Sequence, residues 1–212
     1  MVLEMFHDKN LIKRYIIRNT IKFSIIVFFC FFSFNKICLG QTTDSRLYIS
    51  FYNGILAGPG IEDALLLSAD FDDSYQLYAF AISKKIGSLN KYIDMEIEGQ
   101  IVKHIGEQHH LEFNPVFLLR WLSFPWNQKV NTTFAIGEGL SYATKTPEIE
   151  KDHNEKTSRL LNYLLFEFTF SLKKSSKWHL ITRVHHRSGM YGLFSGVTGA
   201  SNAVGIGLRY CF

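Results

Sequence analysis

The sequence has few cysteines and no excess of charge of either sign. Only Cys211 of its three cysteines lies beyond the first forty positions, so that part of the chain cannot close an internal disulfide. The net charge of +4 over 212 residues gives no indication of the strongly basic surface that nucleic-acid binding requires. Nucleic acid is therefore not an expected partner, and stability must come from the fold itself.

Long apolar runs are missing as well. The stretch "FSIIVFFCFFSF" (residues 23–34) is shorter than the roughly 20 residues that a transmembrane helix needs. Five basic residues precede it, and small residues ending at Gly40 follow it. This order predicts an export signal peptide over residues 1–40 and a mature domain over residues 41–212. An uncleaved membrane anchor is the alternative interpretation of the same segment.

Aromatic residues, by contrast, are abundant at 15% of the chain. Together with a mean hydropathy close to zero, they favour many short, half-apolar strands over a helical membrane bundle. Eight segments beyond Gln41 are predicted to be strands: 47–57, 74–83, 92–102, 112–122, 130–142, 160–172, 178–188 and 202–212. Each is close to the roughly 9–11 residues of a tilted transmembrane strand.

The predicted connections alternate in length along the chain. Short turns are expected at 84–91, 124–129 and 173–177, and longer loops at 58–73, 103–111, 143–159 and 189–201. Outer-membrane barrels show this rhythm, with short periplasmic turns and longer external loops. The fold class is therefore predicted as all-β: an eight-stranded antiparallel transmembrane β-barrel after an N-terminal signal peptide, located in the bacterial outer membrane.

The last predicted strand indicates which face of the barrel is outside. Its apolar residues alternate from Val204 to a final Phe212, and this run resembles the C-terminal assembly signal of bacterial outer-membrane barrels. With the apolar face outward, the lumen receives the following charged residues: Arg46, Asp94, Glu96, Glu98, Arg120, Glu167, Arg183 and Arg209. An eight-stranded barrel is just wide enough to be filled by side chains, so these charges are predicted to pair and block it.

A His/Ser pair lies on the predicted lipid face of the seventh strand. His186 and Ser188 are two residues apart, hence on one face with Cα atoms roughly 6.6 Å apart. They share the parity of Leu180 and Val184 and lie near the external end of the strand. Polar residues at the headgroup interface are ordinary, so a purely structural role is one interpretation.

The residues around this pair favour a catalytic interpretation. The segments "HHRSGMYGLFSG", "GASN" and "GLRY" resemble the C-terminal signature of the lipid A 3-O-deacylase (acyloxyacyl hydrolase-like) outer-membrane barrels. The resemblance implies that Ser188 attacks an acyl ester of lipid A, with His186 as its general base. It also implies lipopolysaccharide as substrate and no cofactor, while a homodimer stays open.

The chain departs from the family pattern at two points. The family has an asparagine directly after the serine, where it can help to form an oxyanion hole, and this chain has Gly189. The family also has a carboxylate in the following loop, where "GMYGLFSGVTGAS" contains none. Two residues of outward parity are candidates to orient His186: Asn202, by proximity on the neighbouring strand, and Glu138, by its chemistry although it lies two strands away. Asn202 is equally a candidate oxyanion donor, as is Gly189, or a cap of the preceding turn.

Two functions therefore stay open at the level of sequence. The first is an outer-membrane serine esterase that removes an ester-linked acyl chain from lipid A of lipopolysaccharide. The alternative is a non-catalytic small barrel with a structural or binding role. His109 and His110, beside Glu107, could bind a metal, but a polar external loop is favoured because no third ligand has recognisable spacing. No metal site is predicted.

Overall fold

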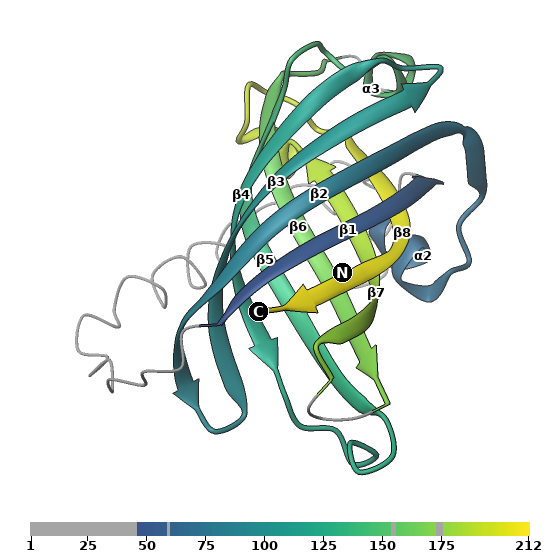
Figure 1. Ribbon diagram of the computed structural model, residues 1–212. Helices are drawn as coiled ribbons and strands as arrows, with labels where there is room; N and C mark the ends of the chain where they lie inside the picture. The colour runs from purple at the N-terminus through teal and green to yellow at the C-terminus, as the bar shows by residue number, and fades with distance from the viewer. Residues whose placement is uncertain (1–45, 59, 154–155, 173–175) are drawn as a thin grey trace, which may run out of the picture. The chain divides into compact units, whose positions relative to one another are not determined.

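The structure, a computed structural model, describes residues 46–58, 60–153, 156–172 and 176–212. These residues form a closed barrel of antiparallel strands that follow one another in chain order (Figure 1). The strands are β1 (Leu47–Ala57), β2 (Phe71–Asn90), β3 (Ile93–Gly106), β4 (His110–Trp121), β5 (Asn131–Ala143), β6 (Leu160–Ser171), β7 (Trp178–Ser188) and β8 (Ala200–Cys211). The predicted eight-stranded barrel is confirmed. The predicted signal peptide over residues 1–40 lies outside the described residues.

Two predicted connections are wrong because the strands around them are longer than expected. Residues 84–91 belong to β2 apart from Lys91, so that Lys91 and Tyr92 alone join β2 to β3. The β2–β3 register shifts twice along this stretch, and such bulges interrupt the period of two by which a strand is recognised. Similarly, residues 103–111 form a loop only at 107–109.

The two ends of the barrel differ in their connections. One end, here the loop end, carries the β1–β2, β3–β4, β5–β6 and β7–β8 connections, and the other is the turn end (Figure 1). The loop end includes α2 (Ile61–Leu66), α3 (Glu148–His153) and the 3₁₀ turn η2 (Met190–Gly192). Among the described residues, neither α2 nor α3 has the length and apolar character to cross a membrane.

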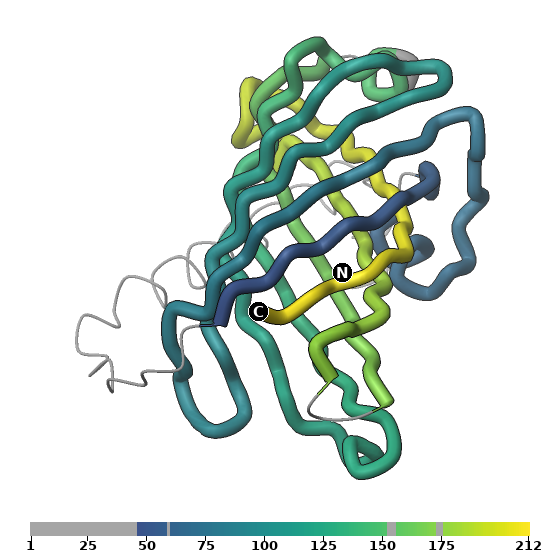
Figure 2. The backbone as a smooth tube through the Cα atoms, viewed as in Figure 1, coloured from purple at the N-terminus to yellow at the C-terminus, as the bar shows by residue number. Residues whose placement is uncertain are grey.

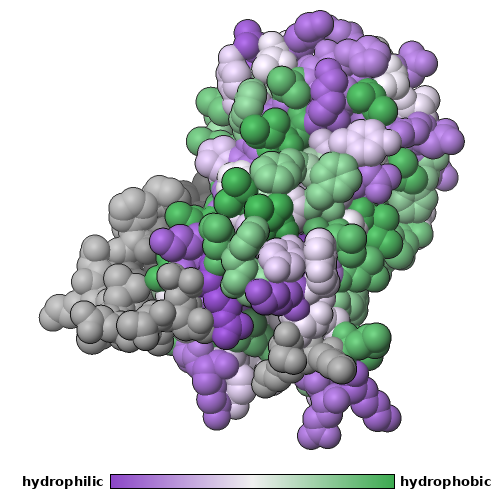
Figure 3. All heavy atoms as spheres, viewed as in Figure 1, coloured by the Kyte–Doolittle hydropathy of each residue, from purple (hydrophilic) through white to green (hydrophobic). Residues whose placement is uncertain are grey.

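The outer surface of the barrel is apolar around its middle. Every strand contributes exposed apolar side chains, among them Phe51, Phe80, Ile97, Phe113, Ile136, Phe168, Leu180 and Leu208. On the face seen in Figure 3, hydrophobic residues gather over the middle and hydrophilic ones at both ends. Water-soluble monomers rarely expose an apolar surface of this extent, so the outer wall is suited to a lipid environment.

The interior near the turn end is a network of paired charges. The network consists of three arginines and three glutamates, all buried: Arg120, Arg183, Arg209, Glu96, Glu98 and Glu167. Arg120 and Arg209 each bind Glu96 at 2.7 Å, Arg183 binds Glu98 at 2.8 Å, and all three arginines donate to Glu167. These inward charges were predicted. Arg46 was wrongly placed among them, since it precedes β1 and is exposed.

Candidate functional site on the outer wall

Four outward positions form one row across neighbouring strands towards the loop end. Glu138 of β5 pairs with Leu164 of β6, Leu164 pairs with His186 of β7, and His186 pairs with Asn202 of β8. Since adjacent strands lie about 4.8 Å apart, Glu138 and His186 are separated by roughly 10 Å of barrel wall. The structure therefore brings Asn202 next to His186 and keeps Glu138 two strands away.

Asn202 holds the imidazole of His186 by one ring nitrogen. The Nδ1 atom of His186 lies 2.6 Å from Oδ1 of Asn202, and Nδ2 of Asn202 donates to the carbonyl oxygen of Gly58 at 2.8 Å. Because Nδ2 is committed to a carbonyl, the amide presents Oδ1, an acceptor, to the ring. The proton of His186 then belongs on Nδ1, which leaves the lone pair on Nε2.

Ser188 lies in the next outward row, beside an asparagine that the sequence reasoning missed. Ser188 of β7 pairs with Asn162 of β6, which is buried and lies close to the carboxyl group of Glu138. Asn162 shares the outward parity of Leu160 and Leu164, so the same argument that singled out Glu138 could have found it. His186, Ser188, Asn162, Asn202 and Glu138 therefore form one polar cluster on an otherwise apolar wall.

Gly189 forms part of the turn after β7, and its backbone N–H is hydrogen-bonded there. Its N–H donates to the carbonyl of Gly199 at 3.1 Å, so this donor is engaged within the β7–β8 connection. A Cβ atom at this position would lie 2.0 Å from the carbonyl oxygen of Val197, a distance that no side chain tolerates. The asparagine that the resembling family has after its serine therefore has no room here.

The β1–β2 connection folds back outside the barrel, where α2 lies against β7 and β8 (Figure 2). Ala64 of α2 is buried against Val184, and Phe166 and Val204 pack against the same group. Val184 and Val204 pair with each other, two residues closer to the turn end than His186 and Asn202. The turn-end side of the cluster is therefore covered by protein, and Asn202 is only 1% exposed.

The end of α2 presents leucines outward from the barrel. Leu65, Leu66 and Leu67 are exposed, and Leu66 is the most exposed of the three at 77%. Leu67 caps the helix in the left-handed conformation, with φ of 56°. Three adjacent exposed leucines next to an apolar wall form a surface suited to acyl chains.

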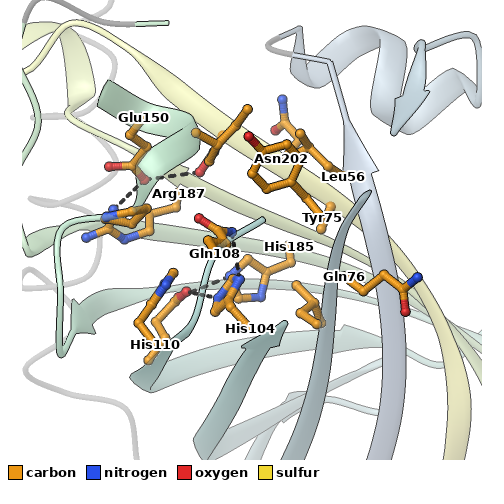
Figure 4. A pocket seen from close by; sticks show the side chains of 16 residues that line it. Leu56, Tyr75, Gln76, His104, Gln108, His110, Glu150, His185, Arg187 and Asn202 are labelled. Carbon is orange, nitrogen blue, oxygen red and sulfur yellow. Dashed lines mark hydrogen bonds and ion pairs between the residues drawn. The ribbon is translucent and has the colours of Figure 1, made fainter. Parts of the chain in front are cut away.

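The adjacent histidines His109 and His110, predicted to lie together in a loop, lie in different environments. His109 is exposed in the turn, whereas His110 begins β4 and is buried in the lumen. Figure 4 shows His110 close to His104, which comes from β3. The interpretation of both histidines as part of a polar external loop is therefore wrong for His110, because the strands continue further towards the loop end than predicted.

Comparison with known proteins shows distant resemblance to small membrane barrels. No family model matches the sequence, and no curated protein matches it. Among solved structures, the chain is similar to Neisserial surface protein A (11% identity, TM-score 0.47, 79% of this chain and 97% of that one). It is also similar to the outer membrane enzyme PagL (13% identity, TM-score 0.47, 76% and 97%). The N-terminal β-barrel domain of Pseudomonas aeruginosa OprF has 12% identity and a TM-score of 0.44 over 79% and 97%.

Proposed function

We propose that this barrel lies in the bacterial outer membrane and is a serine esterase that removes an ester-linked acyl chain from lipid A of lipopolysaccharide. The observation that carries the proposal is the hydrogen-bonded line from Gly58 through Asn202 to His186. It holds an imidazole on the outer wall, two residues from a serine on the same face, and no described residue engages its Nε2 atom.

In the proposed reaction, Nε2 of His186 takes the proton of the Ser188 hydroxyl while Oγ attacks the acyl carbonyl carbon. The tetrahedral intermediate collapses as the ester C–O bond breaks, and His186 returns the proton to the leaving sugar oxygen. An acyl-enzyme remains on Ser188. Water, deprotonated by the same imidazole, then releases the fatty acid and restores the serine.

Asn202 is proposed as the residue that orients His186. An asparagine has this part in Cys-His-Asn hydrolases. Because its amide is neutral, it orients the imidazole as a carboxylate would but does not supply the negative charge, and this lack affects the reaction rate more than the geometry of the site. Since it touches the base and not the substrate, Asn202 is a positioning residue.

Glu138 is proposed to act through Asn162 and not through His186. Asn162 lies close to Glu138; because a carboxylate only accepts hydrogen bonds, we expect Asn162 to turn its Nδ2 group towards it. The second N–H of that amide is then available beside Ser188, the ladder partner of Asn162. This amide can stabilise the oxyanion of the tetrahedral intermediate, a part that the engaged N–H of Gly189 does not perform.

The position of the site supports an outer-leaflet lipid as substrate. The cluster faces outward near the loop end, which in an outer-membrane barrel is the external end. Exposed leucines of α2 border it on the same wall. An ester carbonyl below a sugar headgroup lies at this depth, with its acyl chain alongside the apolar wall.

The alternative is a non-catalytic barrel with a structural or binding role. It is favoured by one specific observation, that Nδ1 of His186 meets an amide oxygen and not a carboxylate. In that case the cluster stabilises the docking of the β1–β2 connection through Gly58.

The test is fatty-acid release from lipopolysaccharide by the purified barrel in detergent. We expect release by the wild type and none above background by Ser188→Ala. Ser201→Ala is a control, since Ser201 is on the adjacent strand and its hydroxyl binds Glu150 at 3.2 Å. Equal release by the wild type and Ser188→Ala on several lipid A forms would leave the structural barrel as the conclusion.

A further inference from the structure

A second cluster of ligand-type side chains lies inside the barrel at the loop end. His104 comes from β3, and His110 and Glu112 come from the start of β4. All three are buried, and their ligand atoms lie within 4.8 Å of one another. The cluster is separate from the proposed esterase site, because its residues face the lumen while His186 and Ser188 face outward.

His110 has a buried nitrogen that meets no hydrogen-bonding group. Its Nε2 atom has no partner among the described residues, although only 3% of the residue is exposed. The ring lies against that of His104, with centroids 4.1 Å apart and planes nearly parallel. A buried, unpaired imidazole nitrogen is destabilising unless something binds it. Its lone pair is therefore a candidate metal ligand.

Glu112 divides its two oxygens between two functions. Oε1 accepts hydrogen bonds from Oγ of Ser141 at 2.7 Å and from Nε2 of His185 at 3.0 Å. Oε2 faces Nε2 of His104 at 2.9 Å. One oxygen is thus held in place by donors, and the other points towards the two stacked histidines. Such support of a ligating carboxylate is typical of the second shell of metal sites.

We propose that His104, His110 and Glu112 bind a divalent transition-metal ion, with zinc as the expected ion. Two imidazoles and one carboxylate are a donor set that zinc accepts, with a fourth position left for water. The same nitrogen-rich set also suits copper and nickel, and it does not suit magnesium or calcium. A cavity of about 30 Å³ adjoins the three residues (Figure 4), and a metal-bound water fits in such a volume.

Gln108 lies beside the other ring nitrogen of His104. Its Nε2 lies 3.1 Å from Nδ1 of His104, while its own Oε1 is buried without a partner among the described residues. Metal binding requires the amide oxygen and nitrogen, which have nearly the same shape, to be exchanged, so that Oε1 accepts a hydrogen bond from Nδ1 of His104 and a metal replaces the hydrogen bond between His104 and Glu112. Nε2 of His104 then turns a lone pair towards the metal, as in most zinc-bound histidines.

The arginine that lines the cavity is already paired with a carboxylate. Arg187 lines the same cavity, but its guanidinium binds Glu150 and donates to Ser141 and to the carbonyls of Ser158 and Arg159. Its charge is therefore compensated by Glu150. Glu112 supplies the charge that the metal ion requires.

The test is calorimetric titration of the purified, metal-free barrel with zinc chloride. We expect one zinc ion per chain, an affinity at least 100-fold lower for His110→Ala, and one 10- to 100-fold lower for Gln108→Ala. His109→Ala is the matched control, because this exposed neighbour is expected to leave the affinity unchanged. Ser188→Ala is expected to bind zinc like the wild type, which separates this site from the proposed esterase.

Folding of each variant is checked by the change in gel mobility between unheated and heated samples. Cobalt substitution gives a second readout, since a four-coordinate site with two histidines is expected to show visible absorption that His104→Ala lacks. The proposal is overturned if the wild type shows no saturable zinc binding, or if folded His110→Ala and His104→Ala bind zinc as tightly as the wild type.

Discussion

Asn202 and His186 face each other across the β7–β8 ladder, with Oδ1 and Nδ1 2.6 Å apart. The pair joins the outer wall to the β1–β2 connection through Gly58. An asparagine with both ends of its amide engaged determines which nitrogen of the histidine carries the proton.

Ser188→Ala and His186→Ala are each expected to lower kcat by at least about 10³-fold, and the double variant is expected to lose no more than the worse single one. The reason is that nucleophile and base act as one unit. Single-turnover fatty-acid release from lipopolysaccharide measures the effect. Additive losses would contradict the assignment of these residues to one reaction.

Asn202→Ala is expected to lower kcat by about 10- to 100-fold. Asn202→Asp is expected to recover part of this loss, because a carboxylate also accepts from Nδ1 and stabilises the imidazolium but cannot donate to the carbonyl of Gly58. Rescue by aspartate distinguishes a positioning residue from a purely structural one. Asn53→Ala is the matched control, since Asn53 is an exposed asparagine on β1. Equal activity of Asn202→Ala and Asn202→Asp would remove Asn202 from the mechanism.

Asn162→Ala is expected to lower kcat by about 10²- to 10³-fold with little change in KM, because an oxyanion donor acts in the transition state. Glu138→Gln is expected to have a smaller effect in the same direction, since glutamine can still accept from Asn162. A Glu138→Gln variant that loses as much activity as His186→Ala would instead place Glu138 in direct contact with the base.

Leu66→Asp is expected to raise KM on lipopolysaccharide in bilayer vesicles and to leave kcat nearly unchanged. The reason is that the exposed leucines of α2 are proposed to meet the acyl chains of the substrate and not the reacting atoms. Leu172→Asp changes another exposed leucine, at the turn end; it is the control and is expected to change neither constant. A fall in kcat without a rise in KM would show that α2 affects the geometry of the site itself.

Glu167→Gln is expected to destabilise the barrel by about 3–5 kcal/mol, because it leaves buried arginines without enough negative charge. Glu167 accepts from Arg120, Arg183 and Arg209. Urea unfolding in vesicles, followed by tryptophan fluorescence, measures the change. Glu107→Gln, at an exposed position, is the control, and equal stability of the two variants would show that the network contributes little.

The sequence by itself determined the number of strands and the side of the wall on which each residue lies. Because successive side chains of a strand point to opposite faces, the outward positions of Glu138, His186 and Asn202 follow from counting along the chain. The inward position of Arg183 follows in the same way. This assignment needs only the alternation of side chains along one strand. It gave the wrong end of β2, because bulges interrupt the alternation between Lys85 and Asn90.

The tertiary structure alone decided which of these residues meet. Contact between His186 and Asn202, and between Asn162 and Ser188, depends on the register of neighbouring strands, which alternation along one strand leaves undetermined. The docking of α2 on the wall and the engagement of the Gly189 N–H depend on how loops pack. The metal-ligand cluster in the lumen forms because β3 and β4 run beyond their predicted ends. Polar inward residues at those ends are predicted from the sequence as part of a loop, and the cluster consists of His104, His110 and Glu112.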